Sequence, residues 1–525
     1  MVSRRRFLAG ASAALSSAAI HTESLANTTP GVLRTAVIGA GMSGLYSAWR
    51  LVNAGHPSAD IAIFEGSARI GGRLRSEAMP GTENIVAEFG GMRYLTSQKL
   101  VSALIRHLAL DNRNFPMGGP ENLSFIRGKR WIEADYGRKG AIPFDLSPDE
   151  AGLDPTGLMV RAIERVVPGA AKLTPEQWPP IQRTAMLDGR PLHAWGYRDV
   201  MNRFLSYEAS MLVRMGGGYN SIPTNWSASE AMPWLLADFA NNPSYLTLVN
   251  GMQTLPTTLG RLVDGQGVKL NMEHRLVALR LDLQVGGLHE LVFETPAGMR
   301  TIHAQRVILG LPRRALDLIE DAPILRHRAV APLLTTVTPR ALAKAFVAHE
   351  TPYWRALGLS SGKATTDMPA RQFFYFGTES GRPVPPKGCL SMAYFDGDAA
   401  DFWDGQRQLE SPGARGFTRL DPTGPFAREM QRQIAAVHAL PTPPPVLSAG
   451  YMNWGDDPYG GGWHSWNQGE KSWEVMDRII DPLPGSGVHI VGEAWSTGQG
   501  WIEGALQTAE NLLTKRLGVP RANWL

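Results

Sequence analysis

The sequence has little of what disulfide-bonded, metal-binding, nucleic-acid-binding or membrane-spanning proteins depend on. Its 525 residues include one cysteine, Cys389, which excludes an internal disulfide and any multi-cysteine zinc or iron–sulfur site. The formal net charge is only +4 and there is no long basic run, so no nucleic-acid-binding surface is expected. Beyond the N-terminus, no apolar run reaches the ~18 residues that a membrane-spanning helix needs. We therefore expect a mature chain without a metal, a nucleic acid or a membrane.

What is present is a globular composition with an excess of glycine. Apolar residues make up 43% of the chain and charged residues 19%, a balance that argues against disorder. The length predicts two to four domains. The chain has 56 glycines and 15 tryptophans. The glycines suggest backbone brought close to a ligand, and the tryptophans suggest either an aromatic-lined site or a large core.

The N-terminus predicts an export signal. Residues 3–8 read S-R-R-R-F-L, an apolar stretch follows to Ile20, and residues 24–26 supply small residues at signal-peptidase spacing. We expect residues 1–26 to be a twin-arginine signal peptide, with the export machinery as a partner and a periplasmic or secreted location. Proteins that take this route fold before export, which suits a cofactor loaded in the cytoplasm.

A glycine-rich turn between two apolar strands predicts a dinucleotide site. Strands are expected at 35–38 and 61–64, and residues 39–44 read G-x-G-x-x-G. Gly39 permits the tight turn, Gly41 lets the backbone approach a pyrophosphate, and Gly44 lets helix and strand pack closely.

The flanking residues complete this prediction. Met42 and Ser43 open the helix expected at 42–52, whose N-terminus attracts phosphate. Glu65 ends the second strand, where a carboxylate can accept hydrogen bonds from both ribose hydroxyls.

Three further segments carry a family resemblance. Residues 65–73 read E-x-x-x-R-x-G-G-R, residues 491–494 read V-G-E-A, and residues 500–505 read G-W-I-E-G-A. Together with the glycine turn, they resemble the motifs of the flavin amine oxidase superfamily, and the resemblance covers essentially the whole mature chain. It implies an FAD cofactor. The implied cofactor contacts beyond the turn and Glu65 are Gly72, Arg73, Gly90, Gly91, Met92, Arg93, Val277, Glu493, Gly500, Trp501 and Ile502.

The resemblance also implies the fold. We expect an α/β protein with an FAD-binding, doubly wound (Rossmann-like) domain, a mixed-sheet substrate domain and a helical insert. The expected boundaries are 31–75, 241–335 and 450–525 for the FAD-binding domain, 76–134 and 336–449 for the substrate domain, and 135–240 for the helical insert.

Covalent attachment of the flavin is not expected. Relatives that tether the flavin use a cysteine before the C-terminal motif, and residues 454–463 contain none. Cys389 falls in strand-like sequence and is interpreted as a small buried residue.

Residues 88–93, E-F-G-G-M-R, resemble a segment of L-amino acid oxidases in which an arginine grips the substrate carboxylate. A guanidinium suits that task because its planar fork matches a carboxylate bidentately. Arg93 is therefore the expected clamp, although a surface or phosphate-pairing arginine is the alternative. Residues 363–371 and 393–398 resemble other runs of the same enzymes, and Tyr394 is the implied second donor to the carboxylate.

Three more residues complete the expected site. Lys344 matches a family lysine that holds a water against the flavin, although a lone lysine in a strand usually faces solvent. Trp463 and Trp501 fall where the family places the walls of an aromatic slot, with core packing as the alternative. Gly500 lies beside Trp501 and is assigned to the substrate as well as to the flavin.

Asp396 lies two residues after Tyr394, and such residues share one face of a strand. An acid facing the substrate would suit a cationic side chain, and the alternative is an aspartate that caps a loop. We adopt the first interpretation and expect a preference for arginine or lysine over aliphatic amino acids, with large aromatic ones as the runner-up.

These expectations combine into oxidative deamination of an L-amino acid by FAD and O₂, giving a 2-oxo acid, ammonia and H₂O₂. The alternatives are a decarboxylating amino acid 2-monooxygenase, an amine or polyamine oxidase, and a flavin-fold protein without turnover. The sequence leaves the oligomeric state open, with a homodimer as one option.

Overall fold

The computed structural model describes residues 32–525 except 223, 225, 241, 242, 283–287, 381 and 383. The expected signal peptide, residues 1–26, lies outside the described residues. Within them, no helix is both long enough and apolar enough to cross a membrane.

The first sheet is built from both ends of the chain. Its strand order is β12-β2-β1-β15-β14-β13, with β24 also pairing β15. β1, β2, β12 and β24 run parallel to their neighbours, and β13, β14 and β15 form an antiparallel meander. The strands are β1 (Val32–Ile38), β2 (Ile61–Phe64), β12 (Lys269–Asn271), β13 (Arg275–Asp282), β14 (Leu288–Thr295), β15 (Gly298–Leu309) and β24 (Val488–Ile490).

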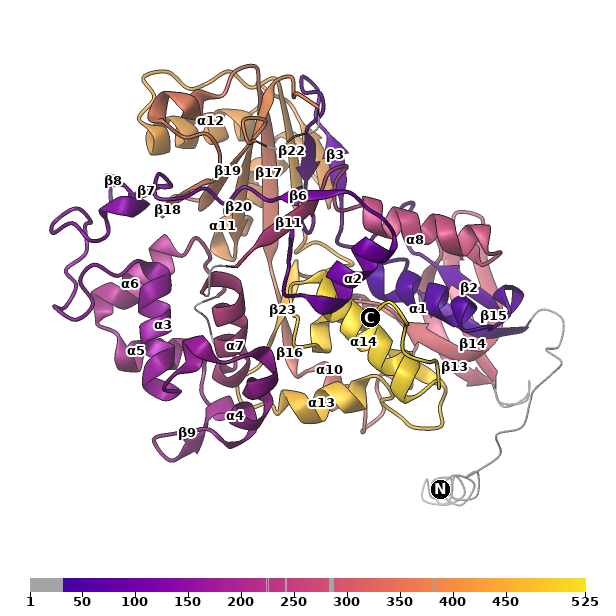
Figure 1. Ribbon diagram of the computed structural model, residues 1–525. Helices are drawn as coiled ribbons and strands as arrows, with labels where there is room; N and C mark the ends of the chain where they lie inside the picture. The colour runs from indigo at the N-terminus through magenta and orange to yellow at the C-terminus, as the bar shows by residue number, and fades with distance from the viewer. Residues whose placement is uncertain are drawn as a thin grey trace, which may run out of the picture.

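Burial explains why the two strands expected at 35–38 and 61–64 could be predicted. All four residues of β2 are buried, as expected for a parallel strand covered on both faces. Helix α1 (Met42–Asn53) packs against α8 (Thr254–Gly265) and α14 (Ile502–Lys515), so indigo and yellow segments lie side by side in Figure 1. A buried ion pair between Arg50 and Glu510 ties α1 to α14.

The second sheet has eight strands in the order β21-β22-β17-β20-β19-β18-β7-β8. Helices α11 (Asp398–Glu410) and α12 (Pro425–His438) pack with it, and α12 lies at the top of Figure 1. Every residue of β17 is buried, which fits a central strand. The strands are β7 (Leu123–Ile126), β8 (Lys129–Ile132), β17 (Leu342–His349), β18 (Lys363–Thr366), β19 (Gln372–Phe376), β20 (Cys389–Asp396), β21 (Phe417–Leu420) and β22 (Ser448–Asn453).

Strand pairing moves two of the expected domain boundaries. β22 pairs with β17 and β21, so a boundary between 449 and 450 would cut a strand of the substrate sheet. β11 (Tyr245–Leu248) pairs with β5 (Tyr94–Leu95) and β6 (Asn112–Asn114) instead of joining the first sheet. The pairing therefore places the second segment of the first sheet from α8 onward and the third after Asn453.

Residues 135–240, the segment expected to be a helical insert, are mainly helical where the structure describes them and lie at the lower left of Figure 1. Asp154 caps α3 by accepting a hydrogen bond from the Gly157 N–H, and Ser206 caps α6 in the same way. Its helices are α3 (Pro155–Val166), α4 (Trp178–Thr184), α5 (Tyr197–Phe204), α6 (Tyr207–Gly216) and α7 (Ala228–Phe239).

The remaining short elements connect these units. β3 pairs β4, β9 pairs β10, and β16 pairs β23. Their bounds, with those of the remaining helices, are β3 (Ser76–Ala78), β4 (Val86–Glu88), α2 (Lys99–His107), β9 (Met186–Leu187), β10 (Arg190–Pro191), α9 (Arg313–Asp317), α10 (Ala331–Leu334), β16 (Val337–Arg340), β23 (Trp463–Trp466) and α13 (Ser472–Ile479).

Candidate active site

One cavity lies where the two sheets and the insert meet, and it holds about 1410 Å³ of empty space out to its mouth. The glycine turn, the segments around residues 72 and 91, and the C-terminal motif form one part of its wall. Sixteen residues predicted from the sequence line it: Gly41, Met42, Ser43, Gly72, Arg73, Gly90, Gly91, Met92, Arg93, Lys344, Tyr394, Trp463, Glu493, Gly500, Trp501 and Ile502.

The glycine turn fits a dinucleotide. A Cβ on Gly44 would lie 2.0 Å from the Gly39 carbonyl oxygen, so helix α1 can approach the turn this closely only without a side chain there. A Cβ on Gly41 would meet only Gly72 Cα, at 3.9 Å, and its face toward the cavity is open. No side chain caps the N-terminus of α1, which leaves its first N–H groups and its dipole available to phosphate.

Glu65 lies beside this turn, outside the residues that line the cavity. Its Oε2 accepts a hydrogen bond from the Ala40 N–H at 2.8 Å, and its Oε1 accepts from Ser67 N–H and Oγ–H at 2.9 and 2.7 Å. The carboxylate thus holds the turn in shape. Its expected contact with a ribose stays a prediction.

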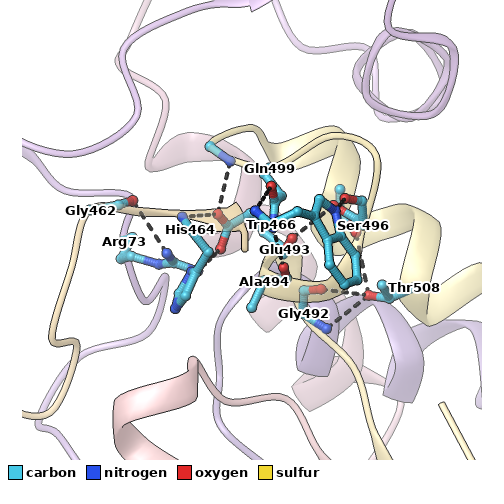
Figure 2. Close-up of polar contacts among 12 residues, drawn as sticks. Arg73, Gly462, His464, Trp466, Gly492, Glu493, Ala494, Ser496, Gln499 and Thr508 are labelled. Carbon is cyan, nitrogen blue, oxygen red and sulfur yellow. Dashed lines mark hydrogen bonds and ion pairs between the residues drawn. The ribbon is translucent and has the colours of Figure 1, made fainter. Parts of the chain in front are cut away.

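Glu493 joins three segments of the cavity wall (Figure 2). Its Oε1 accepts hydrogen bonds from the His464 and Gly500 backbone N–H groups at 2.9 and 2.8 Å, and its Oε2 accepts from Arg73 Nη2 and His464 Nδ1 at 2.7 and 2.9 Å. Burial alone would raise the pKa of Glu493, but Arg73 and His464 hold that pKa far below its usual range. The carboxylate is therefore ionised and pairs the Arg73 cation within the wall.

Lys344 lies on β17 directly opposite Tyr394 on β20. Its Nζ donates to the carbonyl oxygens of Glu88 and Gly90 at 3.0 and 2.5 Å, and lies 5.0 Å from the centre of the Tyr394 ring. Burial lowers the pKa of the Lys344 ammonium. The lysine is buried instead of facing solvent, and its expected role in holding a water stays a prediction.

Arg93 is a buried cation without an acidic partner. Only 7% of the residue is exposed, and no carboxylate of the described residues lies within 4.0 Å of its guanidinium. Its Nη1 donates to the Met117 thioether sulfur at 3.1 Å, a weak acceptor, and its Cζ lies 4.4 Å from the Tyr245 ring centre and 5.3 Å from that of Phe115. A guanidinium left in this state can receive a carboxylate from a ligand.

Aromatic side chains form another part of the wall. Trp463 stacks on Trp234 of α7 with ring centroids 6.0 Å apart and planes at 20°, and Trp501 lies 6.5 Å from Trp234. The Trp234 Nε1–H donates to the Gln499 carbonyl at 2.8 Å, which joins the insert to the C-terminal motif. The insert therefore supplies one wall of the slot expected from Trp463 and Trp501.

The expectation for Asp396 needs correction. Its carboxylate accepts hydrogen bonds from the Asn220 and Ser221 backbone N–H groups at 2.6 and 2.8 Å and from the Ser221 hydroxyl. The residue is fully buried and does not line the cavity. Asp396 ends β20, where the chain turns away, so its side chain caps the 219–222 segment instead of sharing a substrate face with Tyr394.

Four more predicted residues lie outside the lining. Gly39 and Gly44 shape the turn from behind, Glu65 lies beside it, and Val277 is buried in β13, where its carbonyl accepts from the Asp321 N–H at 3.0 Å. The sequence reasoning missed other lining residues, several of them aromatic: Tyr219, Ile222, Trp234, Asp238, Phe239, Leu311, Pro312, Trp454 and Tyr459. The density of aromatic residues between 219 and 239 is the one sequence signal that points to this part of the wall.

The comparisons with known proteins agree with this arrangement. Residues 42–511 match the family described as flavin containing amine oxidoreductase. An uncharacterised protein of Acanthamoeba polyphaga mimivirus is 26% identical, covering 92% of this chain and 93% of its own, and aplysianin-A of Aplysia kurodai is 25% identical, covering 92% and 89%.

Two further comparisons concern proteins whose names state an activity. An L-amino-acid oxidase of Gloydius halys is 26% identical, covering 70% of this chain and 68% of its own. A solved structure of putrescine oxidase with putrescine bound has a TM-score of 0.67 at 18% identity, covering 93% of this chain and 99% of that one. At that identity the structural likeness shows the fold.

Proposed function

The chain belongs to the flavin-containing amine oxidoreductase family, and we propose that it is an FAD-dependent L-amino acid oxidase with a noncovalently bound cofactor. Family membership makes it an oxidoreductase that uses a flavin. The observation that carries the finer proposal is the Arg93 guanidinium, buried in the cavity wall with no acid of its own. A buried, unpaired charge costs several kcal/mol, so a site that keeps one is built to receive its counterion.

The substrate class follows from that counterion. A simple amine has no carboxylate and would leave Arg93 unpaired in the complex, whereas an amino acid supplies a carboxylate that the guanidinium can hold bidentately. Tyr394 and Tyr219 line the same part of the cavity, with ring centroids 5.4 Å apart, and each carries a hydroxyl that can donate to the same carboxylate. This set of donors fixes one end of the substrate and so orients its Cα–H bond.

The net reaction removes two electrons and two protons from the Cα–N bond of the amino acid and passes them to O₂, which becomes H₂O₂. Water hydrolyses the resulting imine to a 2-oxo acid and ammonia. The bound flavin supplies the two-electron redox chemistry. The protein residues hold the substrate and exclude water. The carbonyl oxygens of Glu88 and Gly90 accept hydrogen bonds from the Lys344 Nζ and keep that side chain in the cavity wall.

Noncovalent binding is supported by the position of the one cysteine. Cys389 lies in β20, 1% exposed, with its Sγ directed at the His349 carbonyl oxygen and away from the cavity. Burial raises the pKa of the Cys389 thiol to about 12, which keeps the thiol protonated and unreactive. Export through the twin-arginine route to the periplasm or the medium remains part of the proposal, on the strength of residues 3–8 and 24–26 alone.

The decisive experiment is a screen of the purified flavoprotein against the twenty L-amino acids, putrescine and spermidine, with H₂O₂, ammonia and CO₂ measured together. We expect H₂O₂ and ammonia in equal amounts from amino acids. Peroxide can release some CO₂ from the 2-oxo acid by direct chemical reaction, and added catalase prevents this by removing the peroxide. No other CO₂ is expected. CO₂ that persists with catalase would identify a decarboxylating monooxygenase instead. Turnover of the diamines with no turnover of any amino acid would contradict the proposal.

A further inference from the structure

The cavity contains a second charge that its own neighbours leave incompletely satisfied. Five charged residues of the described chain line it: Arg73, Arg93, Asp238, Lys344 and Glu493. Arg73 and Glu493 pair with each other at 2.7 Å, and the Lys344 Nζ donates to two backbone carbonyls. Arg93 and Asp238 have the fewest partners: neither has an ion pair among the described residues, and the side chain of each makes one hydrogen bond, Arg93 to Met117 and Asp238 to Tyr245.

Asp238 lies in the last turn of α7 and is only 4% exposed. Its Oδ1 accepts a hydrogen bond from the Tyr245 hydroxyl at 3.0 Å, and none of the described residues donates a hydrogen bond to its Oδ2. A buried carboxylate can accept about four hydrogen bonds, so most of this capacity is unused. The unused capacity lies at the wall of the cavity, where a ligand can reach it.

The position of Asp238 relative to Arg93 divides the site into two charged ends. Tyr245 lies between them, with its ring 4.4 Å from the Arg93 Cζ and its hydroxyl on Asp238. The two charges interact through space but do not form an ion pair within 4.0 Å. When a substrate carboxylate pairs with Arg93, that cation no longer balances the Asp238 charge.

The rest of the insert's wall offers no other charge. The described insert residues that line the cavity with Asp238 are Tyr219, Ile222, Trp234 and Phe239, all apolar or aromatic. Lys363, which also interacts with Asp238 through space, lines a separate, neighbouring cavity on the far side of Tyr219, Ile222 and Phe239. A buried carboxylate without an ion-pair partner in such surroundings favours a cationic ligand over an uncharged one.

We propose that Asp238 is the specificity-determining residue that accepts the distal cationic nitrogen of a dibasic substrate, the ammonium of lysine or the guanidinium of arginine. The inference rests on the proposed function for the identity of the other end, the carboxylate on Arg93. The expected preference for arginine or lysine is thereby kept, but it is assigned to Asp238 on the insert instead of Asp396 on the second sheet. The cationic group donates hydrogen bonds to the free oxygen of Asp238 and pairs with its charge. A neutral side chain of equal length can do neither.

The test compares L-lysine with L-norleucine, which has the same carbon chain without the terminal ammonium. In the wild-type flavoprotein, we expect kcat/KM for lysine to exceed that for norleucine by at least tenfold. Asp238→Asn should lower kcat/KM for lysine about 10²-fold and change that for norleucine less than threefold, so that the preference is lost. Asp238→Glu keeps the charge and should keep lysine ahead of norleucine.

The matched control is Asp396→Asn, the same substitution at a buried acid that does not line the cavity. Its ratio of lysine to norleucine turnover should equal that of the wild type. Equal losses for both substrates in Asp238→Asn would overturn the inference, since they would place Asp238 at the α-amino group or in a structural role. A wild-type enzyme that does not distinguish lysine from norleucine would also overturn it.

A binding measurement keeps the inference testable if Asp238→Asn does not fold. 6-Aminohexanoate and hexanoate both carry the carboxylate, and only the first carries a distal ammonium. We expect 6-aminohexanoate to inhibit the wild type at least tenfold more strongly, and equal inhibition would overturn the inference. Failure of the proposed function can be told apart from failure of this inference. If the enzyme oxidises amines and no amino acid, the proposed function fails. Turnover of putrescine and butylamine, with and without a distal ammonium, is then compared in the wild type and Asp238→Asn, and this comparison tests the role of Asp238 by itself.

Discussion

At the scale of single residues, Arg93 is the part of the site whose removal is most informative. If Arg93 binds the substrate carboxylate as proposed, Arg93→Ala removes a bidentate, charge-assisted contact and should lower kcat/KM for amino acids by about 10²–10⁴. Arg93→Lys keeps the charge but loses the planar fork, so it should recover only part of that loss. Steady-state assays of H₂O₂ release measure both, with the flavin absorbance as the check that cofactor binding is retained. Normal turnover in Arg93→Ala would contradict the carboxylate clamp.

Asp396 offers a contrasting prediction, because its carboxylate holds protein groups only. Three donors from Asn220 and Ser221 converge on it, and an asparagine can accept fewer of them without repulsion between donors. Asp396→Asn should therefore raise KM for all amino acids by a similar factor, since the 219–222 segment carries the cavity residues Tyr219 and Ile222. Thermal unfolding should also shift to lower temperature. A change confined to basic substrates would restore Asp396 as the selector.

At the scale of secondary structure, the junction of β1, the glycine turn and α1 determines how the cofactor domain closes. Gly44→Ala would place a methyl group 2.0 Å from the Gly39 carbonyl oxygen, and α1 would have to move away from the turn. We expect a loss of ~1–3 kcal/mol in unfolding free energy and a lower flavin content per chain. Urea titration and the ratio of absorbance at 450 to 280 nm measure the two effects.

The matched control for this change is Gly405→Ala in α11. Gly405 is exposed, and a Cβ there would meet nothing within 4 Å. Because alanine favours a helix over glycine, this variant should be equally stable or up to ~1 kcal/mol more stable, with full flavin content. A similar loss in both variants would show that the close approach at Gly44 does not matter.

At the scale of the whole molecule, the substrate domain contains a buried histidine that links stability to pH. The Nε2 of His438 lies 2.6 Å from the Tyr375 hydroxyl and its Nδ1 2.8 Å from the Ile434 carbonyl oxygen, and the side chain is fully buried. Burial lowers the pKa of His438 to about 4. The folded state therefore keeps this histidine neutral at a pH where the unfolded chain, with a pKa near ~6.5, binds a proton.

The sign of the effect follows from that difference. The contribution of His438 is fully present above about pH 6.5 and is lost as the pH falls toward about 4, a change of up to ~3 kcal/mol. His438→Gln should be less stable than the wild type at pH 7, and the gap in unfolding free energy should narrow at pH 4.5. Urea titrations of both proteins at the two pH values measure it. A gap that stays constant would show that the pKa of His438 does not differ between the folded and unfolded states.

Much of the cofactor domain could be predicted from the sequence because its requirements are local. A strand buried on both faces is continuously apolar, a turn that meets phosphate needs glycine, and a helix follows at once. The expected strand 61–64 coincides with β2, and the expected helix 42–52 ends one residue short of α1. The boundary at 449 could not be placed, because the pairing of β22 with β17 joins residues about a hundred positions apart.

The residues of the candidate site also fall into those that the sequence could predict and those that it could not. The sequence by itself predicted the motifs shared with the flavin family, Arg93 as the carboxylate clamp and Lys344 as a site residue, since each lies in a short segment with a recognisable motif. The pairing of Lys344 with Tyr394 across two strands came from the structure. Only the tertiary structure decided which acid faces the cavity. Asp396 and Asp238 are alike as residues, but the first meets the N–H groups of a segment about 175 positions away, while the second is left with an unused oxygen at the cavity wall. The direction of a side chain, and whether a neighbour has already satisfied it, depends on which distant segments the fold packs against it.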